Sequence, residues 1–156
     1  DPAEPLTNKN ITGFAALGEL YSESEKNLMA EKGVLVLEQN GFNMKVRHGI
    51  TTSVAEVNSA EITLVQIKDY VIEATRANLA ELYVGRKLMP TIIGDVQTTL
   101  ASILSQFQAQ QVIIGFGGVS IKRSPEDPRA IDVVFEIEAV YPLNYINISF
   151  SFAGVN

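Results

Sequence analysis

Large apolar residues alternate with other side chains at the end of the chain. A period of two residues is typical of a β-strand that presents one apolar face. Such a strand needs an apolar surface and a hydrogen-bonding partner, either in the sheet of its own chain or in a neighbouring subunit. Chain topology alone favours its own sheet, because terminal strands are usually held there. The apolar members are Ile146, Ile148, Phe150 and Phe152, and they alternate with Tyr145, Asn147, Ser149 and Ser151.

A short helix is predicted over residues 22 to 32. Ser22 and Glu25 have the spacing of a capping box, in which each side chain bonds the backbone of the other residue. Gly33 stands where a helix commonly ends in a left-handed residue. Residues 1 to 20 contain prolines, asparagines and glycines without clear periodicity, so we expect an extended lead-in.

Two long helices are predicted further along the chain. Apolar residues recur at helical spacing over 68 to 84, and Gly85 stands at the C-cap position. The other helix, over 91 to 108, follows Pro90 and has one continuous apolar stripe. Residues 61 to 67 are rich in β-branched side chains, so we expect a short strand or an extended entry to the first of these helices.

Strands are predicted on both sides of the long helices. The apolar run 34 to 37 predicts a buried strand, and Asn40-Gly41 predicts a hairpin turn into a returning strand over 43 to 48. We expect a loop over residues 51 to 60.

A second hairpin is predicted near the end of the chain. Residues 119 to 123 and 131 to 140 form its strands, 124 to 129 its loop, and the glycine-rich residues 115 to 118 a flexible entry. The predicted fold class is α/β, more narrowly α+β. It has a mixed or antiparallel sheet packed against two long helices and one short helix, and an extended C-terminal strand.

Composition limits the possible partners. The chain has 156 residues, 46% of them hydrophobic, which is enough for the core of one domain. The net charge is −6 and no lysine or arginine cluster is present, so we expect no nucleic-acid partner. No apolar run reaches the about 18 residues of a membrane span, so we expect no membrane insertion. The chain opens on Asp1 without a signal peptide, and we expect it to be a piece of a longer polypeptide.

Residues suited to catalysis are sparse. His48 is the sole histidine, and we interpret it as a structural or surface residue. Asp132, Glu136 and Glu138 share one face of a predicted strand, which we interpret as its solvated side. The glycines at 115 to 118 precede a strand and lack the lysine of a phosphate-binding loop. With no cysteine either, we expect no enzymatic activity, no catalytic residues, no cofactor and no metal site.

Several phrases stand in an order and at a spacing that resemble bacteriophage contractile-tail sheath proteins, and the later ones resemble the C-terminal domain of that family. The resemblance covers nearly the whole chain. The phrases are Asp1-Pro-x-x-Pro-Leu-Thr-Asn-Lys9, Tyr21-Ser22, Glu31-Lys-Gly-Val34, Val46-Arg-His-Gly-Ile-Thr-Thr52, Glu61-Ile-Thr-Leu-Val-Gln-Ile-Lys-Asp-Tyr70, Tyr83-Val-Gly-Arg-Lys87, Asp127-Pro128 and Tyr141-Pro-Leu-Asn-Tyr-Ile-Asn-Ile-Ser-Phe150.

The resemblance implies a structural role in the virion. Sheath subunits stack as hexameric rings around a tail tube, and their contraction drives the tube through the host envelope. The implied partners are other copies of the chain, the tail tube protein, the baseplate and the tail terminator. The implied location is the tail sheath, with assembly in the host cytoplasm. A sheath or baseplate component of a related contractile machine, such as an R-type bacteriocin or a type VI secretion system, and a generic interaction module are the alternatives.

The resemblance also divides the chain and reverses the topological expectation for its last strand. It implies a lead-in over 1 to 20, a sheath-type C-terminal domain over 21 to 144 and an arm over 145 to 156. In this family such arms add strands to sheets of neighbouring subunits. When no neighbour is present, we expect the arm to fold back, swap or be disordered, with pairing to residues 131 to 140 favoured. The implied subunit-interface residues are Tyr145, Ile146, Asn147, Ile148, Ser149, Phe150, Ser151 and Phe152. The helix over 91 to 108 and the adjacent loops are candidates for contact with the tube.

Overall fold

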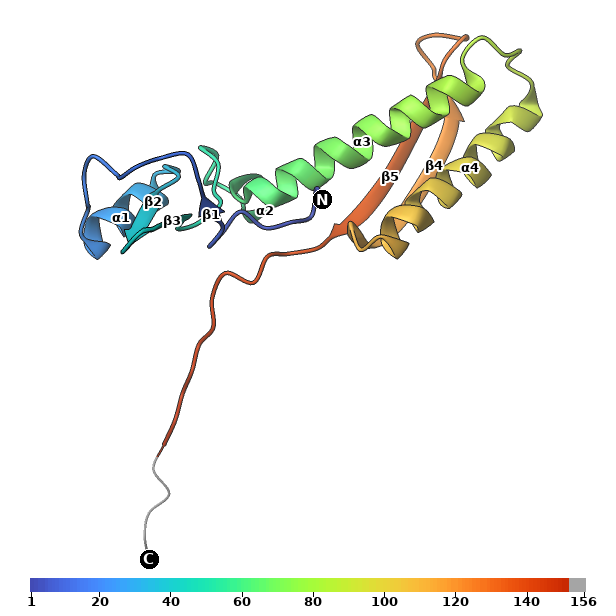
Figure 1. The fold of residues 1–156 in the computed structure, drawn as a ribbon. Coiled ribbons are helices and arrows are strands. Elements are labelled where there is room, and N and C mark those ends of the chain that lie inside the picture. Colours follow the sequence, from blue (N-terminus) through green and yellow to red (C-terminus); the bar gives the residue numbers. More distant parts are fainter. Residues whose placement is uncertain (152–156) are drawn as a thin grey trace, which may run out of the picture.

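The computed structural model describes residues 1–151 and contains two separate antiparallel sheets (Figure 1). Strands β1, β3 and β2 form one sheet in that order, and β4 and β5 form the other. The predicted α+β class is confirmed, although the strands do not join in one sheet. The elements are β1 (Asn10–Ile11), α1 (Glu23–Glu31), β2 (Leu37–Asn40), β3 (Asn43–Val46), α2 (Val57–Ala60), α3 (Ile62–Tyr83), α4 (Pro90–Ala109), β4 (Ile113–Arg123) and β5 (Ile131–Ala139).

Helix α3 connects the two sheets. Its 22 residues span about 33 Å at the usual helical rise. Its first turns lie beside the three-stranded sheet, and the rest runs along α4 and the β4–β5 hairpin (Figure 1). The molecule therefore has a small part, made by α1, β1, β2 and β3, and a larger part, made by α3, α4, β4 and β5.

The main core belongs to the larger part. Helix α3 packs on α4, and α4 packs on β4. The apolar stripe predicted for α4 is confirmed, because every buried residue of that helix lies on it. The alternate residues of β5 that face the core are half-buried against this cluster. The buried members of the cluster are Leu64, Ile67, Val71, Leu100, Ile103, Leu104, Phe107, Val112 and Ile113.

The entry to α3 differs from the prediction. Residues 61 to 67 are helical from Ile62 onward, so the predicted strand is wrong. Leu64, Ile67 and Val71 follow one another at spacings of three and four residues and are all buried. Burial of this helical stripe outweighs the β-propensity of the single residues, because strand propensity depends strongly on packing context. Residues 51 to 60, predicted as a loop, include the short helix α2.

The first hairpin is confirmed with shifted bounds. Strand β2 begins at Leu37, so the predicted buried strand over 34 to 37 is largely wrong, and Val34 and Leu35 are exposed. The turn residues are 41 and 42, one position later than predicted. Gly41 has a φ of 62°, which fits the first central position of a type II′ turn.

The second hairpin is longer than predicted. Strand β4 begins at Ile113, so the glycine-rich residues 115 to 118 lie inside the strand. The register shifts twice, between Ile113 and Gly115 and between Gly117 and Ser120, and each shift places one extra residue on β4. The loop over 124 to 129 and the alternating strand β5 are as predicted.

Charged side chains attach α1 to the first hairpin. The predicted capping box is present, with Ser22 N donating to Glu25 over 2.8 Å. The helix buries none of its residues. Instead, Arg47 donates to Glu23 over 2.7 Å, to Asn27 over 2.8 Å, and also to Glu38. The fold thus holds α1 by ion pairs and hydrogen bonds.

We expect Leu104→Ala to lower the free energy of unfolding by about 2–5 kcal/mol, because it leaves a cavity in a fully buried position. Leu82→Ala is the matched control on α3, since Leu82 is 43% exposed and its truncation leaves no buried cavity. Denaturant unfolding of both variants measures the difference. Equal losses would contradict the assignment of the core.

We expect α1 to detach in Arg47→Ala and at low pH. Hydrogen bonds from Lys26 and then Arg47 hold the pKa of Glu23 below its ordinary value. A lowered pKa means that the attachment is present above the ordinary glutamate range of about 4.3 and is lost as the pH falls through the lowered pKa. Hydrogen exchange of the α1 amides measures detachment. Arg129→Ala, which breaks an ion pair in the β4–β5 loop, is the control and should leave α1 protected.

Candidate interaction site

The predicted interface residues form an exposed, extended segment. None of the residues 145 to 151 lies in a strand, and Phe152 lies outside the described residues. Ile146, Ile148 and Phe150 are 74%, 83% and 82% exposed. Figure 1 shows this segment running away from the rest of the molecule. We call residues 145 to 151 the arm.

The expectation that the arm pairs with residues 131 to 140 is wrong. Strand β5 pairs with β4, and the chain beyond Ala139 turns toward the start of α3. Several contacts hold it there, among them a hydrogen bond of 2.9 Å from the Tyr141 hydroxyl to Asn58 Oδ1 and one of 2.7 Å from Asn144 Nδ2 to Glu61 Oε1. These contacts direct the chain away from β5, so the arm begins near the three-stranded sheet.

A polar cluster lies at the root of the arm. It consists of His48, Glu61, Asn144 and Tyr145, and we call it the root cluster. His48 Nε2 lies 2.8 Å from Glu61 Oε1 and 3.0 Å from Asn144 Nδ2, and the Tyr145 hydroxyl lies 3.4 Å from His48 Nδ1. The rings of His48 and Tyr145 meet edge to face at 5.8 Å. Sequence reasoning missed this cluster, because no pattern connects residues so far apart in the chain.

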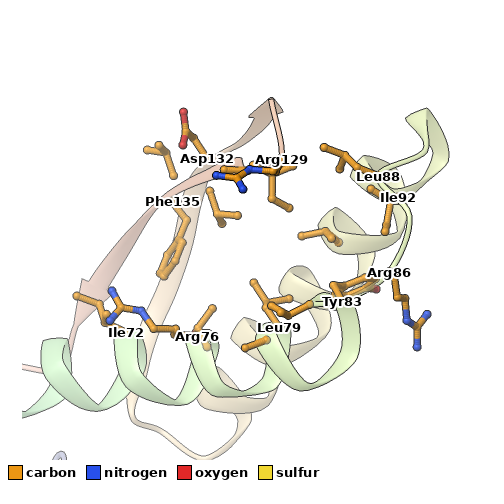
Figure 2. A pocket seen from close by; sticks show the side chains of 18 of the residues that line it. Ile72, Arg76, Leu79, Tyr83, Arg86, Leu88, Ile92, Arg129, Asp132 and Phe135 are labelled. Atoms are coloured by element: carbon orange, nitrogen blue, oxygen red, sulfur yellow. The ribbon is translucent and has the colours of Figure 1, made fainter. Parts of the chain in front are cut away.

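An apolar groove separates α3 from β5. It has a volume of about 960 Å³ and is open to solvent. Figure 2 shows side chains from α3, from the start of α4 and from β5 gathered around it. Phe135 and Leu79 line it from opposite sides, with Arg76 among the few charged side chains. Consecutive residues of β5, from 131 to 135, border the groove, so an edge of this strand faces it.

The outer face of α4 is almost uncharged. Among the 20 residues of this helix, Asp95 is the only charged one. The other exposed positions are occupied by Pro, Thr, Gly, Gln, Ser and Ala residues. A surface helix normally carries several charges on its solvated side, so this face suits contact with another uncharged surface.

The remaining candidate chemistry stays dispersed. Asp132, Glu136 and Glu138 lie on the exposed side of β5, as predicted. Within residues 1–151 no three His, Cys, Asp or Glu side chains gather in a way that would hold a metal ion. In the same part of the chain, every helix is too short or too polar to cross a bilayer.

Fold and site together define an α+β protein with an exposed alternating arm, a two-stranded sheet and an open groove beside that sheet. No protein-family model matches the chain. It is 29% identical over 153 residues to a tail sheath protein of Mycobacterium phage Bxz1, covering 97% of this chain and 26% of that protein. It is 28% identical over 143 residues to a tail sheath protein of Bacillus phage SP01, covering 88% and 24%. The chain therefore spans about a quarter of the length of these relatives.

Solved structures agree on the fold. The anti-feeding prophage baseplate contains a chain with a TM-score of 0.85 at 14% identity, covering 97% of this chain and 45% of that one. The contracted helical sheath of the same prophage gives a TM-score of 0.81 at 15% identity, covering 96% and 45%. The predicted resemblance to the contractile-tail sheath family is confirmed by the sequence relatives and by these folds.

Proposed function

We propose that the chain is the assembling part of a structural subunit of a contractile phage tail sheath, with no enzymatic role. The similarity to two phage tail sheath proteins over most of this chain carries the proposal. In this proposal the subunits stack in rings around a tail tube, and their contraction drives the tube through the host envelope. The subunit is a component of the virion tail and assembles in the host cytoplasm. Residues 21 to 144 form the body, and residues 145 to 156 form the C-terminal segment, which begins with the arm.

The arm is proposed to donate a strand to a neighbouring copy. Its apolar side chains alternate and are exposed, as a strand that waits for a sheet requires. A two-stranded sheet leaves each strand with an unpaired edge, and the edge of β5 borders the groove. An arm added there gains main-chain hydrogen bonds along β5 and places Ile146, Ile148 and Phe150 toward the apolar groove.

The free energy of burying the arm is large enough for a contact between sheath subunits. Burying each of these side chains contributes about 1.5–3 kcal/mol, so three of them give a substantial interface from a short segment. The contact is head to tail, because the arm of one copy meets the groove of the next. Heterologous contacts of this kind generate rings or helices, as a sheath requires.

The tube-facing surface is proposed to be the outer face of α4. Because Asp95 is the only charge on this helix, contact there depends on close packing of small polar side chains rather than on ion pairs. The tail tube protein is the proposed partner on this face. The baseplate and the tail terminator are the proposed partners at the two ends of the sheath.

A baseplate subunit is the second candidate. The TM-score of 0.85 to a chain of the anti-feeding prophage baseplate favours it, whereas the TM-score of 0.81 to the contracted sheath of the same prophage favours the sheath. Electron microscopy of the assembled full-length subunit separates the two. Long tubes built from this subunit alone support the sheath, and closed rings that do not stack support the baseplate.

We expect deletion of residues 145 to 156 to leave the body folded and to abolish tubes. The side chains of residues 145 to 151 are exposed in the isolated chain, so the melting temperature should change by only a few degrees. Thermal unfolding and electron microscopy of the full-length subunit measure the two effects. A melting temperature lowered by tens of degrees would place the arm in its own fold and contradict the proposal.

The donated strand also predicts a difference between its two faces. Ile146→Ser with Ile148→Ser should abolish tubes, because both apolar anchors are lost. Asn147→Ala with Ser149→Ala changes the opposite face at the same distance along the arm and should preserve tubes. In the copy that receives the arm, Phe135→Arg should also abolish tubes, because it places a charge in the groove.

We expect charges on α4 to prevent tube attachment. Thr98→Lys with Ser105→Lys places two charges on one exposed face, where burial against an uncharged partner is costly. The measurement is co-assembly with purified tube protein, scored as the fraction of sheaths that enclose a tube. Glu73→Lys with Ala77→Lys on the exposed side of α3 is the control. Equal tube enclosure by both variants would rule out α4 as the tube-facing surface.

A further inference from the structure

The root cluster joins three distant parts of the chain. His48 follows β3, Glu61 caps α3, Asn144 directly precedes the arm, and Tyr145 is the first residue of the arm. Asn144 Nδ2 donates to Glu61 Oε1 over 2.7 Å, and it also lies 3.0 Å from His48 Nε2. The hydrogen bond between Tyr141 and Asn58 lies nearby and holds the preceding residues. From Ile146 to Ser151 the side chains are exposed.

His48 Nε2 lies near both Glu61 Oε1 and Asn144 Nδ2, and it can donate to the first or accept from the second, but not both. In the tautomer that carries its proton on Nε2, His48 donates to the Glu61 carboxylate. His48 Nδ1 then accepts from the Tyr145 hydroxyl. Glu61, His48 and Tyr145 thus form one chain of hydrogen bonds, and the amide of Asn144 supports the carboxylate from the side. The imidazole of His48 and the amide of Asn144 therefore both connect the root of the arm to the N-cap of α3.

Burial strengthens the hydrogen bonds of the root cluster. Glu61 is 8% exposed, and the side chain of His48 is 20% exposed. Hydrogen bonds to a charged group in such a place are stronger than those at an open surface. Glu61 also anchors the backbone here, since residue 61 forms an isolated bridge with Ile50. The arm is therefore tied to a rigid point of the fold.

Two buried oxygens destabilise the root cluster. Glu61 Oε2 and Asn144 Oδ1 are buried and have no hydrogen-bond partner among the described residues. A buried acceptor without a partner is costly, and it becomes solvated when the cluster opens. The cluster therefore combines strong contacts with an internal cost, which is the balance that a releasable attachment needs.

We propose that His48, Glu61 and Asn144 are positioning residues: they hold the root of the arm against the start of α3, set the direction in which the arm leaves, and make the chain just beyond Tyr145 the pivot. The root can detach without unfolding the body, because the core cluster includes none of these residues. This inference rests on the proposed function only for its effect on assembly. It gives His48 a role that its place in the sequence did not indicate.

The test measures the position of the arm directly. The chain has no cysteine, so spin labels can be attached at Ala77→Cys on α3 and Asn147→Cys on the arm without background. Electron spin resonance distance measurements then report a narrow component for the attached root and a broad one for the detached root. His48→Ala and Asn144→Ala should each enlarge the broad component about tenfold, as loss of a charge-assisted hydrogen bond implies.

Matched variants separate positioning from general damage. His48→Gln keeps an N–H where Nε2 stands and should restore much of the narrow component. Ser149→Ala, in the arm but outside the cluster, should leave the distribution unchanged. If His48→Ala reduces the melting temperature, Asn144→Ala still decides the question, because Asn144 lies outside every helix and strand. Unchanged distributions in Asn144→Ala would overturn the proposal.

Assembly of the full-length subunit is scored separately. A broader distribution supports the positioning role whether or not tubes form. If tubes form normally with a detached root and also after deletion of the arm, then the proposed function of the arm fails and the positioning role stands. If the distribution stays narrow in both alanine variants while tubes are lost, the positioning role fails and the arm remains the assembly element.

Discussion

The packing of α4 between α3 and the β4–β5 sheet is the interaction on which the larger part of the molecule depends. Leu100, Leu104 and Phe107 lie along one stripe of α4 and are buried between the two neighbours. Because one helix serves both contacts, α3 and β5 stand on opposite sides of an open groove rather than against each other. The groove follows from this arrangement.

The small part of the molecule is held in a different way. Its sheet buries Met44 and Val46, but α1 adds no buried residue and relies on Arg47 and its acidic partners. Such contacts weaken with salt and with acid, whereas the α4 stripe does not depend on charge. The two ends of the molecule therefore respond differently to the same change of solvent.

The sequence predicts the elements whose signals are local. The capping box of α1, the stripe of α4 and the alternation of β5 each lie within a few turns or residues, and each is confirmed. The prediction for the start of α3 was wrong because its β-branched residues suggested a strand. These residues are helical because Leu64 and Ile67 are buried in the core that α4 completes, and the local sequence does not show that contact.

The candidate site shows the same limit. The alternation of Ile146, Ile148 and Phe150 predicted a strand, yet an alternating segment forms one only beside a partner, and no local signal tells whose sheet supplies it. The root cluster was invisible for a related reason, since His48 and Asn144 are brought together by the fold across 96 positions. The groove likewise depends on the spacing of whole elements.

The two register shifts in β4 have a consequence for how selective the sheet is. Each extra residue interrupts the spacing of backbone donors and acceptors and increases the local twist. Strand β4 therefore presents an irregular edge, which is a poor template for a foreign strand, whereas β5 runs without interruption from Ile131 to Ala139. An exposed two-stranded sheet would otherwise invite random aggregation from either side. Because of the bulges, only the edge of β5 is regular enough to pair with a further strand, so the sheet can be extended on that side alone.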